Sequence, residues 1–556
     1  MSVQSPPPAA QTPIARHALL WRWFDRSILE LGRQMRWSYL PPLMVYMAAG
    51  VSGLTGIVGT FFVKEYLGLS AAFLAALGFW AGLPWALKMP LGHLVDLIWR
   101  WKSYLVFLGA GLIAASLLIM IGLIGDRAAM AAVMTVEAWF VLAALLAPIG
   151  YVVQDVVADA MTVEAVPRVN TDGTPVADHD RKAMHVTMQT LGRVAIIGGT
   201  VLVALANVYL FRDAAAMPEA QKVATYTEIY TLALVIPLIS VGGVLVAHWV
   251  RQRQLRQLRA HGLSEADAAK LLHPHVERPP VNWWILGGGF GFAAFSLLVG
   301  LGDFPWREEI VFVTSMAIII FMIVKLVREL DPQARNVLVG TAIVIFIYRA
   351  TPSTGDGSTW WMIDELGFDQ QFISVLSLIA SGLTLFGMFL FRRFMADNSI
   401  AYVIGFLTIV GTILSLPTLG MYYGIHEWTA AHTNGVVDAR FIALVDTALS
   451  SPLGQIAMIP MLAWIANSAP ENLKATFFAV MASFTNLALA ASQLFTKYLN
   501  EIWIVQRAVI EPQTGVVQTA ADYSRLGELL IAVIAIGFIV PMATIGIIKL
   551  TRFRSA

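Results

Sequence analysis

The chain has 556 residues, of which 58% are hydrophobic and only 13% are charged, and its formal net charge is +1. Soluble domains carry about a quarter charged residues, so this composition excludes a soluble globular protein of this size. The near-neutral charge indicates no particular class of partner. The absence of cysteine excludes disulfides, thiolate metal sites and cysteine nucleophiles.

Residues 1–38 form a polar, Pro-rich segment followed by an arginine-rich one, without the features of a cleavable signal peptide. Insertion into a membrane is therefore expected to begin with the first span. Before that span, apolar residues recur at helical spacing among the arginines: Leu20, Phe24, Ile28, Leu31 and Met35. This pattern predicts an amphipathic helix at the membrane interface.

Long apolar runs follow, and a run of about 20 such residues crosses the roughly 30 Å hydrocarbon core of a bilayer as a helix. The runs are too long and too continuous for the alternating strands of a membrane barrel. They predict an all-α integral membrane protein with fourteen transmembrane helices, at 39–65, 69–95, 103–125, 130–156, 183–211, 227–250, 281–302, 307–328, 334–362, 370–391, 399–423, 439–466, 473–500 and 524–549.

An even number of spans places both termini on one side of the membrane. Lys and Arg gather in alternate connecting segments, among them Arg33, Arg36, Lys102, Arg181 and Arg251. Because positively charged loops stay in the cytoplasm, both termini are expected there.

The segment 251–280 is basic and then His- and Pro-rich, which indicates a cytoplasmic linker. It divides the chain into an N-terminal six-helix half at 39–250, an extra helix pair at 281–330, a C-terminal six-helix half at 331–550 and a tail at 551–556. A metal site at His273 and His275 is disfavoured because only two nearby histidines are available.

A faint internal repeat supports the two halves, because residues 65–74 align with 364–373 at an offset of 299. The repeat pairs the first span with the ninth, and repeats of this kind place the substrate site near the membrane midplane. The ninth span then has Arg349 at mid-depth, beside a Pro- and Gly-rich break at 352–357. Broken helices at that depth face protein or a water-filled cavity rather than lipid.

Asp155 and Asp159 are four residues apart at the end of the fourth span, so they share a helix face. Two adjacent carboxylates in a membrane need either a bound proton or a nearby cation. Coupling or gating is the functional interpretation, and it extends to Glu164. The structural alternative is pairing with cations such as Arg181, Lys182 or Arg193.

Candidate substrate-binding cations are Arg349, Arg193 and Lys88, since intramembrane charges are rare and usually functional. A guanidinium group suits a carboxylate or phosphate, but pairing of the arginines with Asp155, Asp356 or Asp446 is the alternative. Lys88 suits an anionic substrate or the carboxylate cluster, or else extends to the headgroups.

Asp356 and Trp85 complete the candidate substrate-binding set, although a transmembrane tryptophan can equally face lipid. In the loop after the second span, Asp96 and Arg100 follow Gly92 at a spacing suited to locking helix ends together. They are candidate gating residues.

Four stretches resemble signatures of the folate–biopterin transporter family of the major facilitator superfamily, and they lie at 83–96, 155–164, 350–368 and 458–488. The resemblance implies the major facilitator fold and proton-driven uptake of folates or pterins. Met89 before Pro90 is a small departure, and the extra helix pair departs from the family's usual twelve helices. Related muropeptide permeases have fourteen helices and a segment similar to 154–160.

Muropeptide or acyl-CoA transport therefore stays open, as does a non-transporting role in assembling pigment–protein complexes. No phosphate-binding Gly-Lys-[Ser/Thr] loop, zinc spacing or nucleophile elbow is present, which disfavours an ATP-driven pump and an enzyme. The expected partners are a small anionic organic solute, protons and the lipid bilayer, with no nucleic acid, metal or cofactor. The chain is expected to be a monomer in a bacterial inner membrane.

Overall fold

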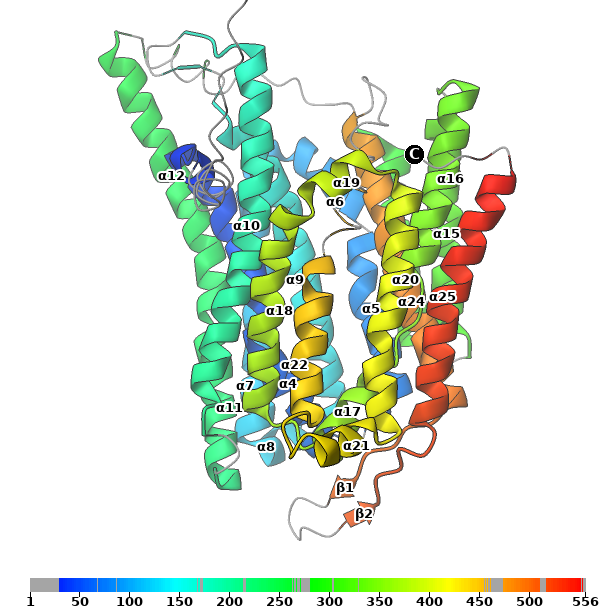
Figure 1. Ribbon diagram of the computed structural model, residues 1–556. Coiled ribbons are helices and arrows are strands. Elements are labelled where there is room, and N and C mark those ends of the chain that lie inside the picture. Colours follow the sequence, from blue (N-terminus) through cyan, green and yellow to red (C-terminus); the bar gives the residue numbers. More distant parts are fainter. Residues whose placement is uncertain are drawn as a thin grey trace, which may run out of the picture.

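The structure is a computed structural model that describes residues 30–553 except 68, 87, 168, 171–173, 214–216, 263, 265–266, 268–270, 272–280, 303–304, 329, 455, 457, 459–460, 462–473, 511–516 and 552. The amphipathic helix predicted before residue 30 and the two linker histidines lie outside the described residues. The helices run mostly parallel to one axis and form a single bundle (Figure 1).

The N-terminal half of the bundle follows the short helix α2 (Glu30–Arg33). It consists of η2 (Trp37–Tyr39), α3 (Leu40–Val51), η3 (Ser52–Thr55), α4 (Gly56–Tyr66), α5 (Ala71–Ala86), α6 (Lys88–Leu97), η4 (Trp99–Trp101), α7 (Ser103–Gly125), α8 (Arg127–Ala131), α9 (Val136–Ala165), α10 (Asp178–Leu210), α11 (Glu219–Ala233) and α12 (Val235–Ala260). Helix α12 continues ten residues into the segment assigned to the linker, because its Arg- and Gln-rich sequence has no helix breaker before Gly262.

The extra pair follows as α14 (Trp283–Leu301) and α15 (Arg307–Val327). The C-terminal half consists of α16 (Pro332–Arg349), α17 (Asp356–Asp364), α18 (Gln370–Leu390), α19 (Arg392–Asp397), α20 (Ile400–Tyr422), α21 (Ile425–His432), α22 (Ala439–Ser450), η6 (Ser451–Leu453), α24 (Lys474–Ile502), the strands β1 (Val509–Ile510) and β2 (Val517–Thr519), and α25 (Leu526–Leu550). The antiparallel β1–β2 hairpin lies at one end of the bundle, below α17 and α21 in Figure 1.

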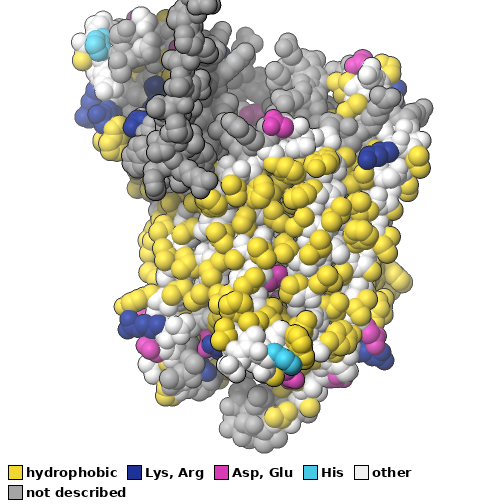
Figure 2. Space-filling model, viewed as in Figure 1, with side chains coloured by type: hydrophobic (Ala, Val, Ile, Leu, Met, Phe, Trp, Pro, Cys, Tyr) yellow, Lys and Arg dark blue, Asp and Glu magenta, His cyan; other side chains and the backbone are white. Residues whose placement is uncertain are grey.

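The predicted all-helical membrane architecture is confirmed. Among the described residues, ten helices or continuous helix pairs are long and apolar enough to cross a membrane. Each of the other four predicted spans also contains a helix, namely α15, α16, α22 or α24, and the count of fourteen stays a prediction. Figure 2 shows a broad apolar band around the visible face, with nearly all visible charged side chains at its two ends.

The two ends of the bundle differ in what they carry. One end holds α8, α17, α21 and the β-hairpin, and is called the hairpin end below (Figure 1). The other end, called the linker end, holds the last turns of α12 and the C-terminus. In the predicted topology the linker end faces the cytoplasm.

The first and ninth spans are broken at equivalent places. In the first span, the 3-10 helix η3 at Ser52–Thr55 separates α3 from α4. In the ninth, residues 350–355 separate α16 from α17, and Gly355 there has a φ of 68°. The repeat offset of 299 brings these two breaks into register. The first span therefore narrows to a 3-10 turn where the ninth span leaves the helix altogether.

Contacts between the halves run along two helix pairs, since α5 packs on α24 and α10 packs on α18. Within the N-terminal half, α3 packs on α10 through glycines. A Cβ added to Gly50 would lie 2.2 Å from the Ile196 carbonyl oxygen, and one added to Gly199 would lie 2.8 Å from Gly50. The close approach of α3 and α10 thus requires both glycines.

Replacement of Gly50 by alanine is expected to destabilise the bundle by about 1–3 kcal/mol, because the added methyl group overpacks a backbone contact. The apparent melting temperature of the purified protein in detergent measures this. Gly56→Ala is the matched control, because a Cβ there has no heavy atom within 4 Å. Equal melting temperatures for the two variants would contradict the assigned α3–α10 contact.

Candidate functional site

An ion triad lies inside the N-terminal half, where α6, α9 and α3 meet. The Lys88 Nζ atom lies 2.6 Å from Asp155 Oδ2 and 2.7 Å from Asp159 Oδ2. The Tyr46 hydroxyl donates to Asp159 Oδ1 at 2.7 Å. The i,i+4 spacing on α9 is what turns both carboxylates toward the same lysine.

The structure identifies the cation that lies beside the two carboxylates. The nearby cation that the two carboxylates need is Lys88, and Arg193 lies close enough to Asp155 to interact electrostatically. One lysine between two carboxylates leaves a surplus negative charge on the three groups. Asp159 is the more accessible carboxylate, since 46% of its side chain is exposed against 17% for Asp155.

Glu164 belongs to a different contact from the triad. Its Oε1 atom lies 2.6 Å from the Nζ atom of Lys102, a side chain that also stacks on Trp99. This pair joins α9 to the start of α7. The structure places Asp96 in the last turn of α6 and Arg100 in η4, rather than in a loop. Both are exposed and do not pair with each other in the described structure, so their gating role stays a prediction.

Arg349 ends α16 at the break in the ninth span. Its Nε atom donates to the Thr485 carbonyl oxygen of α24 at 3.1 Å. Among the described residues, no carboxylate lies within ion-pair distance of it. Asp356, which begins α17 after the break, is half-buried. Trp85 lies in α5, and its carbonyl oxygen accepts from Asn486 of α24 at 3.3 Å, a contact between the two halves.

A cavity of about 390 Å³ lies between the halves. Its walls come from η3, α4 and α10 on one side and from α17 and α18 on the other. The polar lining consists of hydroxyl groups and one amide, from Thr60, Thr200, Thr359, Ser377, Ser381 and Asn207, and the described lining contains no charged side chain. Gly53 and Gly56 leave space on the α4 side.

Sequence reasoning did not single out Asn207. Its side chain is 2% exposed, and its Oδ1 atom is buried without a hydrogen-bond partner among the described residues. A buried amide oxygen without a donor is costly, so it suits a ligand that brings an N–H or O–H group. The position of Asn207 as an amide within the apolar run 183–211 is the sequence feature that could have identified it.

Asp446 was considered only as a partner for an arginine. In the structure its Oδ1 atom is buried on α22, without a hydrogen-bond partner among the described residues. The residue as a whole is half-buried, but a buried carboxylate oxygen without a donor disfavours the charged form. Asp446 therefore joins Asp155 and Asp159 as a candidate proton-binding residue.

The hairpin end of the cavity is closed by contacts between the halves. Lys64 of α4 pairs with Asp364 of α17 at 2.5 Å, and the Tyr523 hydroxyl donates to the same carboxylate. Around this pair, the buried aromatic side chains of the two halves form one cluster, which includes Phe61, Phe62, Trp360, Trp361 and Phe368.

Arg507, between α24 and the β-hairpin, extends the closure by stacking on Trp360 at 5.5 Å. Burial lowers the pKa of the Arg507 guanidinium, against the opposing effects of Tyr523 and Asp364. For Tyr523, burial and the hydrogen bond to Asp364 both raise the pKa of the phenol. The raised pKa keeps the Tyr523 phenol neutral at physiological pH, so its hydroxyl can donate to Asp364.

Comparison with known proteins identifies relatives of this chain. The model of the BT1 family matches residues 299–553. The chain is 25% identical over 469 residues to a folate-biopterin transporter of Synechocystis sp., covering 84% of this chain and 75% of the relative. It is 23% identical to folate transporter 2 of Plasmodium falciparum over 151 residues, 27% of this chain and 32% of the relative. The predicted resemblance is confirmed, and these relatives are named as transporters.

Solved structures support the predicted fold. A POT family transporter crystallised with 5-aminolevulinic acid has a TM-score of 0.58 at 13% identity, covering 93% of this chain and 96% of that chain. A POT family transporter with a thioalcohol-conjugated peptide gives 0.55 at 13% identity, covering 95% and 97%. At this identity the likeness concerns the fold alone, and it confirms the major facilitator architecture.

Removal of the Lys88 charge is expected to lower stability, because two carboxylates in the bundle then lack their cation. Lys88→Met should cost about 2 kcal/mol, and the double variant Lys88→Met/Asp155→Asn should recover at least half of the loss in apparent melting temperature. The control is Arg212→Met, since the exposed Arg212–Asp213 pair contributes little. A double variant less stable than Lys88→Met would contradict this account of the triad.

Proposed function

We propose that this multi-pass membrane transporter, a relative of the folate–biopterin transporters, takes up folate- or pterin-like anionic solutes by proton-coupled alternating access. The observation that carries the proposal is the cavity between the two halves, which places hydroxyl groups and one amide among apolar side chains and is closed at the hairpin end. A volume of about 390 Å³ is in the usual range for small-molecule sites. Its position between the 3-10 turn of the first span and α17 of the ninth suits a transport site.

The cavity lining favours a flat heterocycle that carries hydrogen-bond donors. Hydroxyl groups can donate or accept, whereas the free Oδ1 atom of Asn207 can only accept. A pterin ring presents amino and ring N–H groups and has no charge, which matches an uncharged lining. We assign the ring to the cavity and a carboxylate of the solute to Arg349, whose guanidinium is held at the break by one bond to the Thr485 backbone.

Proton coupling is assigned to the surplus carboxylate of the triad. One proton on Asp159, the more exposed partner, would leave Lys88 paired with Asp155 alone. Proton binding then changes the charge that α6, α9 and α3 share. Such a change in charge alters how strongly these helices attract one another, so it can favour one access state over the other. Asp446 is the second candidate for this role. We also propose that the protein lies in a bacterial inner membrane with both termini in the cytoplasm.

Purified protein in proteoliposomes is expected to take up labelled folate or a labelled pterin, and more of it with an inward proton gradient. Arg349→Ala should lower folate uptake at least tenfold, because folate loses the partner of its carboxylate. Pterin uptake should fall less, because a pterin without a carboxylate makes no such contact. Arg212→Ala, which removes an exposed cation, is the control. Absence of uptake of both compounds by folded protein at any gradient would refute the substrate assignment. Muropeptides, acyl-CoA and co-purification with pigment proteins would then be tested.

Coupling can be separated from binding within the same vesicles. Asp159→Asn is expected to abolish the stimulation by a proton gradient while counterflow of labelled against unlabelled solute continues, because exchange needs no net proton movement. Asp213→Asn is the exposed control. Retained stimulation in Asp159→Asn together with its loss in Asp446→Asn would transfer the coupling role to α22.

Asn207→Ala is expected to reduce uptake of both solutes about tenfold, because the solute loses one buried hydrogen bond. The melting temperature should stay unchanged. The thermal stability should persist because the Oδ1 atom has no bond to lose among the described residues. Asn398→Ala, outside the cavity lining, is the control. Wild-type uptake by Asn207→Ala would remove this side chain from the substrate site.

A further inference from the structure

The extra helix pair α14–α15, called the bridging pair below, contacts both halves of the transporter. Helix α14 packs on α6, while α15 packs on α24 and also touches α5. On the α14 side the packing is tight. A Cβ at Gly289 would lie 2.4 Å from Pro90, and one at Gly300 would lie 2.9 Å from the Trp80 ring. The bridging pair is thus closely fitted to α5 and α6 of the N-terminal half.

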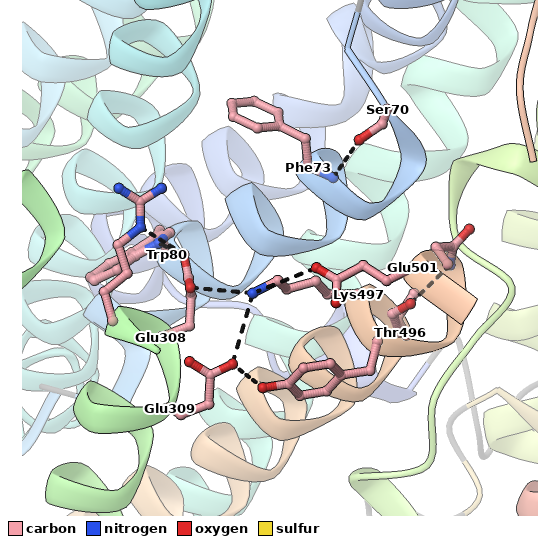
Figure 3. Close-up of polar contacts among 11 residues, drawn as sticks. Ser70, Phe73, Trp80, Glu308, Glu309, Thr496, Lys497 and Glu501 are labelled. Carbon is pink, nitrogen blue, oxygen red and sulfur yellow. Dashed lines mark hydrogen bonds and ion pairs between the residues drawn. The ribbon is translucent and has the colours of Figure 1, made fainter. Parts of the chain in front are cut away.

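A polar network attaches α15 to both halves through one carboxylate (Figure 3). The Glu308 Oε1 atom accepts from Trp80 Nε1 of α5 at 3.1 Å. Its Oε2 atom accepts from Lys497 Nζ of α24 at 3.4 Å. Glu308 is 4% exposed, so water does not compete for these contacts. The two oxygens of one buried side chain therefore bind opposite halves.

Neighbouring groups fix the position and charge of Glu308. Arg307 Nε donates to its Oε1 atom at 3.1 Å. Glu309 pairs with Lys497 at 3.8 Å and accepts from the Tyr498 hydroxyl, and Glu501 lies 3.9 Å from Lys497. Apolar packing continues around the network, because side chains of α5, α14, α15, α16 and α24 belong to one buried cluster.

The contacts of Glu308 couple the bridging pair to the movement that alternating access requires. The network lies toward the last turns of α24, which lead into the β-hairpin. Opening of the hairpin end would separate α5 from α24 there. Since Glu308 binds one residue on each, separation must break either the Trp80 or the Lys497 contact. The closed state keeps both contacts, so the carboxylate favours that state over the open one.

We propose that the bridging pair is a conformational clamp, in which Glu308 links Trp80 of one half to Lys497 of the other and stabilises the state closed at the hairpin end. The clamp rests on the proposed alternating access, but it assigns a role to helices outside the two halves. It predicts that weakening either contact shifts the population toward the open state, without any change at the cavity or the triad.

The test measures the opening of the hairpin end directly by spin labelling. Because the chain has no cysteine, Val133→Cys and Val436→Cys introduce two unique labels. Both positions are exposed, at 79% and 64%, and they lie at this end in opposite halves. Electron–electron distance measurements on full-length protein in nanodiscs, without added solute, give the ratio of long to short distances.

Glu308→Gln, Trp80→Phe and Lys497→Met are each expected to raise that ratio about tenfold, the effect of losing one hydrogen bond to a charged group. Glu528→Gln is the matched control. Glu528 also accepts from an indole, that of Trp503, and pairs with a cation, Arg525, but all three belong to the C-terminal half. Its ratio should equal that of the unsubstituted protein. Melting temperatures identify any variant that fails to fold, and the remaining variants then decide the result.

Lys64→Met, which removes the ion pair to Asp364, separates failure of the clamp from failure of the proposed function. A raised ratio in Lys64→Met with unchanged ratios in the three clamp variants would overturn the clamp and leave alternating access standing. Unchanged ratios in all four would overturn the clamp and also count against alternating access. A similar rise in Glu528→Gln would show a general loosening of this end and would likewise overturn the clamp.

Discussion

A charged side chain inside a low-dielectric bundle needs a partner, and here the partner comes from a neighbouring helix. The contacts between helices depend on these pairs. Lys88 stands between Asp155 and Asp159, so α6 is tied to α9. Glu308 stands between Trp80 and Lys497, so α15 is tied to two helices at once. At a buried group such as Glu308 no water replaces a lost partner. Such pairs therefore act as fixed connections between helices that are otherwise packed by apolar side chains.

Three polar groups lack such a partner among the described residues, and each has a role in the proposed function. Arg349 makes one bond to a backbone carbonyl, and an oxygen atom of Asp446 has no donor among the described residues. The same is true of the amide oxygen of Asn207. Asp446 and Asn207 can therefore accept a proton or a solute without breaking an existing contact at these oxygen atoms, whereas a proton on Asp159 acts by weakening its pairing with Lys88. A transporter needs both kinds of polar group, because paired groups stabilise the bundle and unpaired ones can bind a proton or a solute.

The first and ninth spans provide the other requirement, a space between the halves that carries hydrogen-bonding groups. The 3-10 turn at 52–55 and the break at 350–355 interrupt their helices at corresponding positions of the internal repeat. Gly53 of the 3-10 turn and Gly56 just after it line the cavity, and Thr359 lines it from the helix that follows the second break. The bridging pair has no counterpart in the first half of the repeat. Its contacts lie on the outside of the α5–α24 pair, away from the residues that line the cavity.

The sequence by itself determined the class of protein, the positions of the helices and the identity of the unusual charges. These properties depend on the transfer of each residue from water to lipid, which is local, so apolar runs and the isolated Lys88, Arg193 and Arg349 are visible without a fold. The spacing of Asp155 and Asp159 also sufficed to place them on one face. The break beside Arg349 was visible from its Pro and Gly residues.

Only the tertiary structure decided which charges meet. Lys88 is 67 residues from Asp155, and Glu308 is 228 residues from Trp80, so no periodicity connects them. The importance of Asn207 comes from the absence of a hydrogen-bond donor around its oxygen, which depends on every helix that packs nearby. Partners across a bundle are set by helix packing and by the rotation of each helix about its axis, and these are properties of the whole chain.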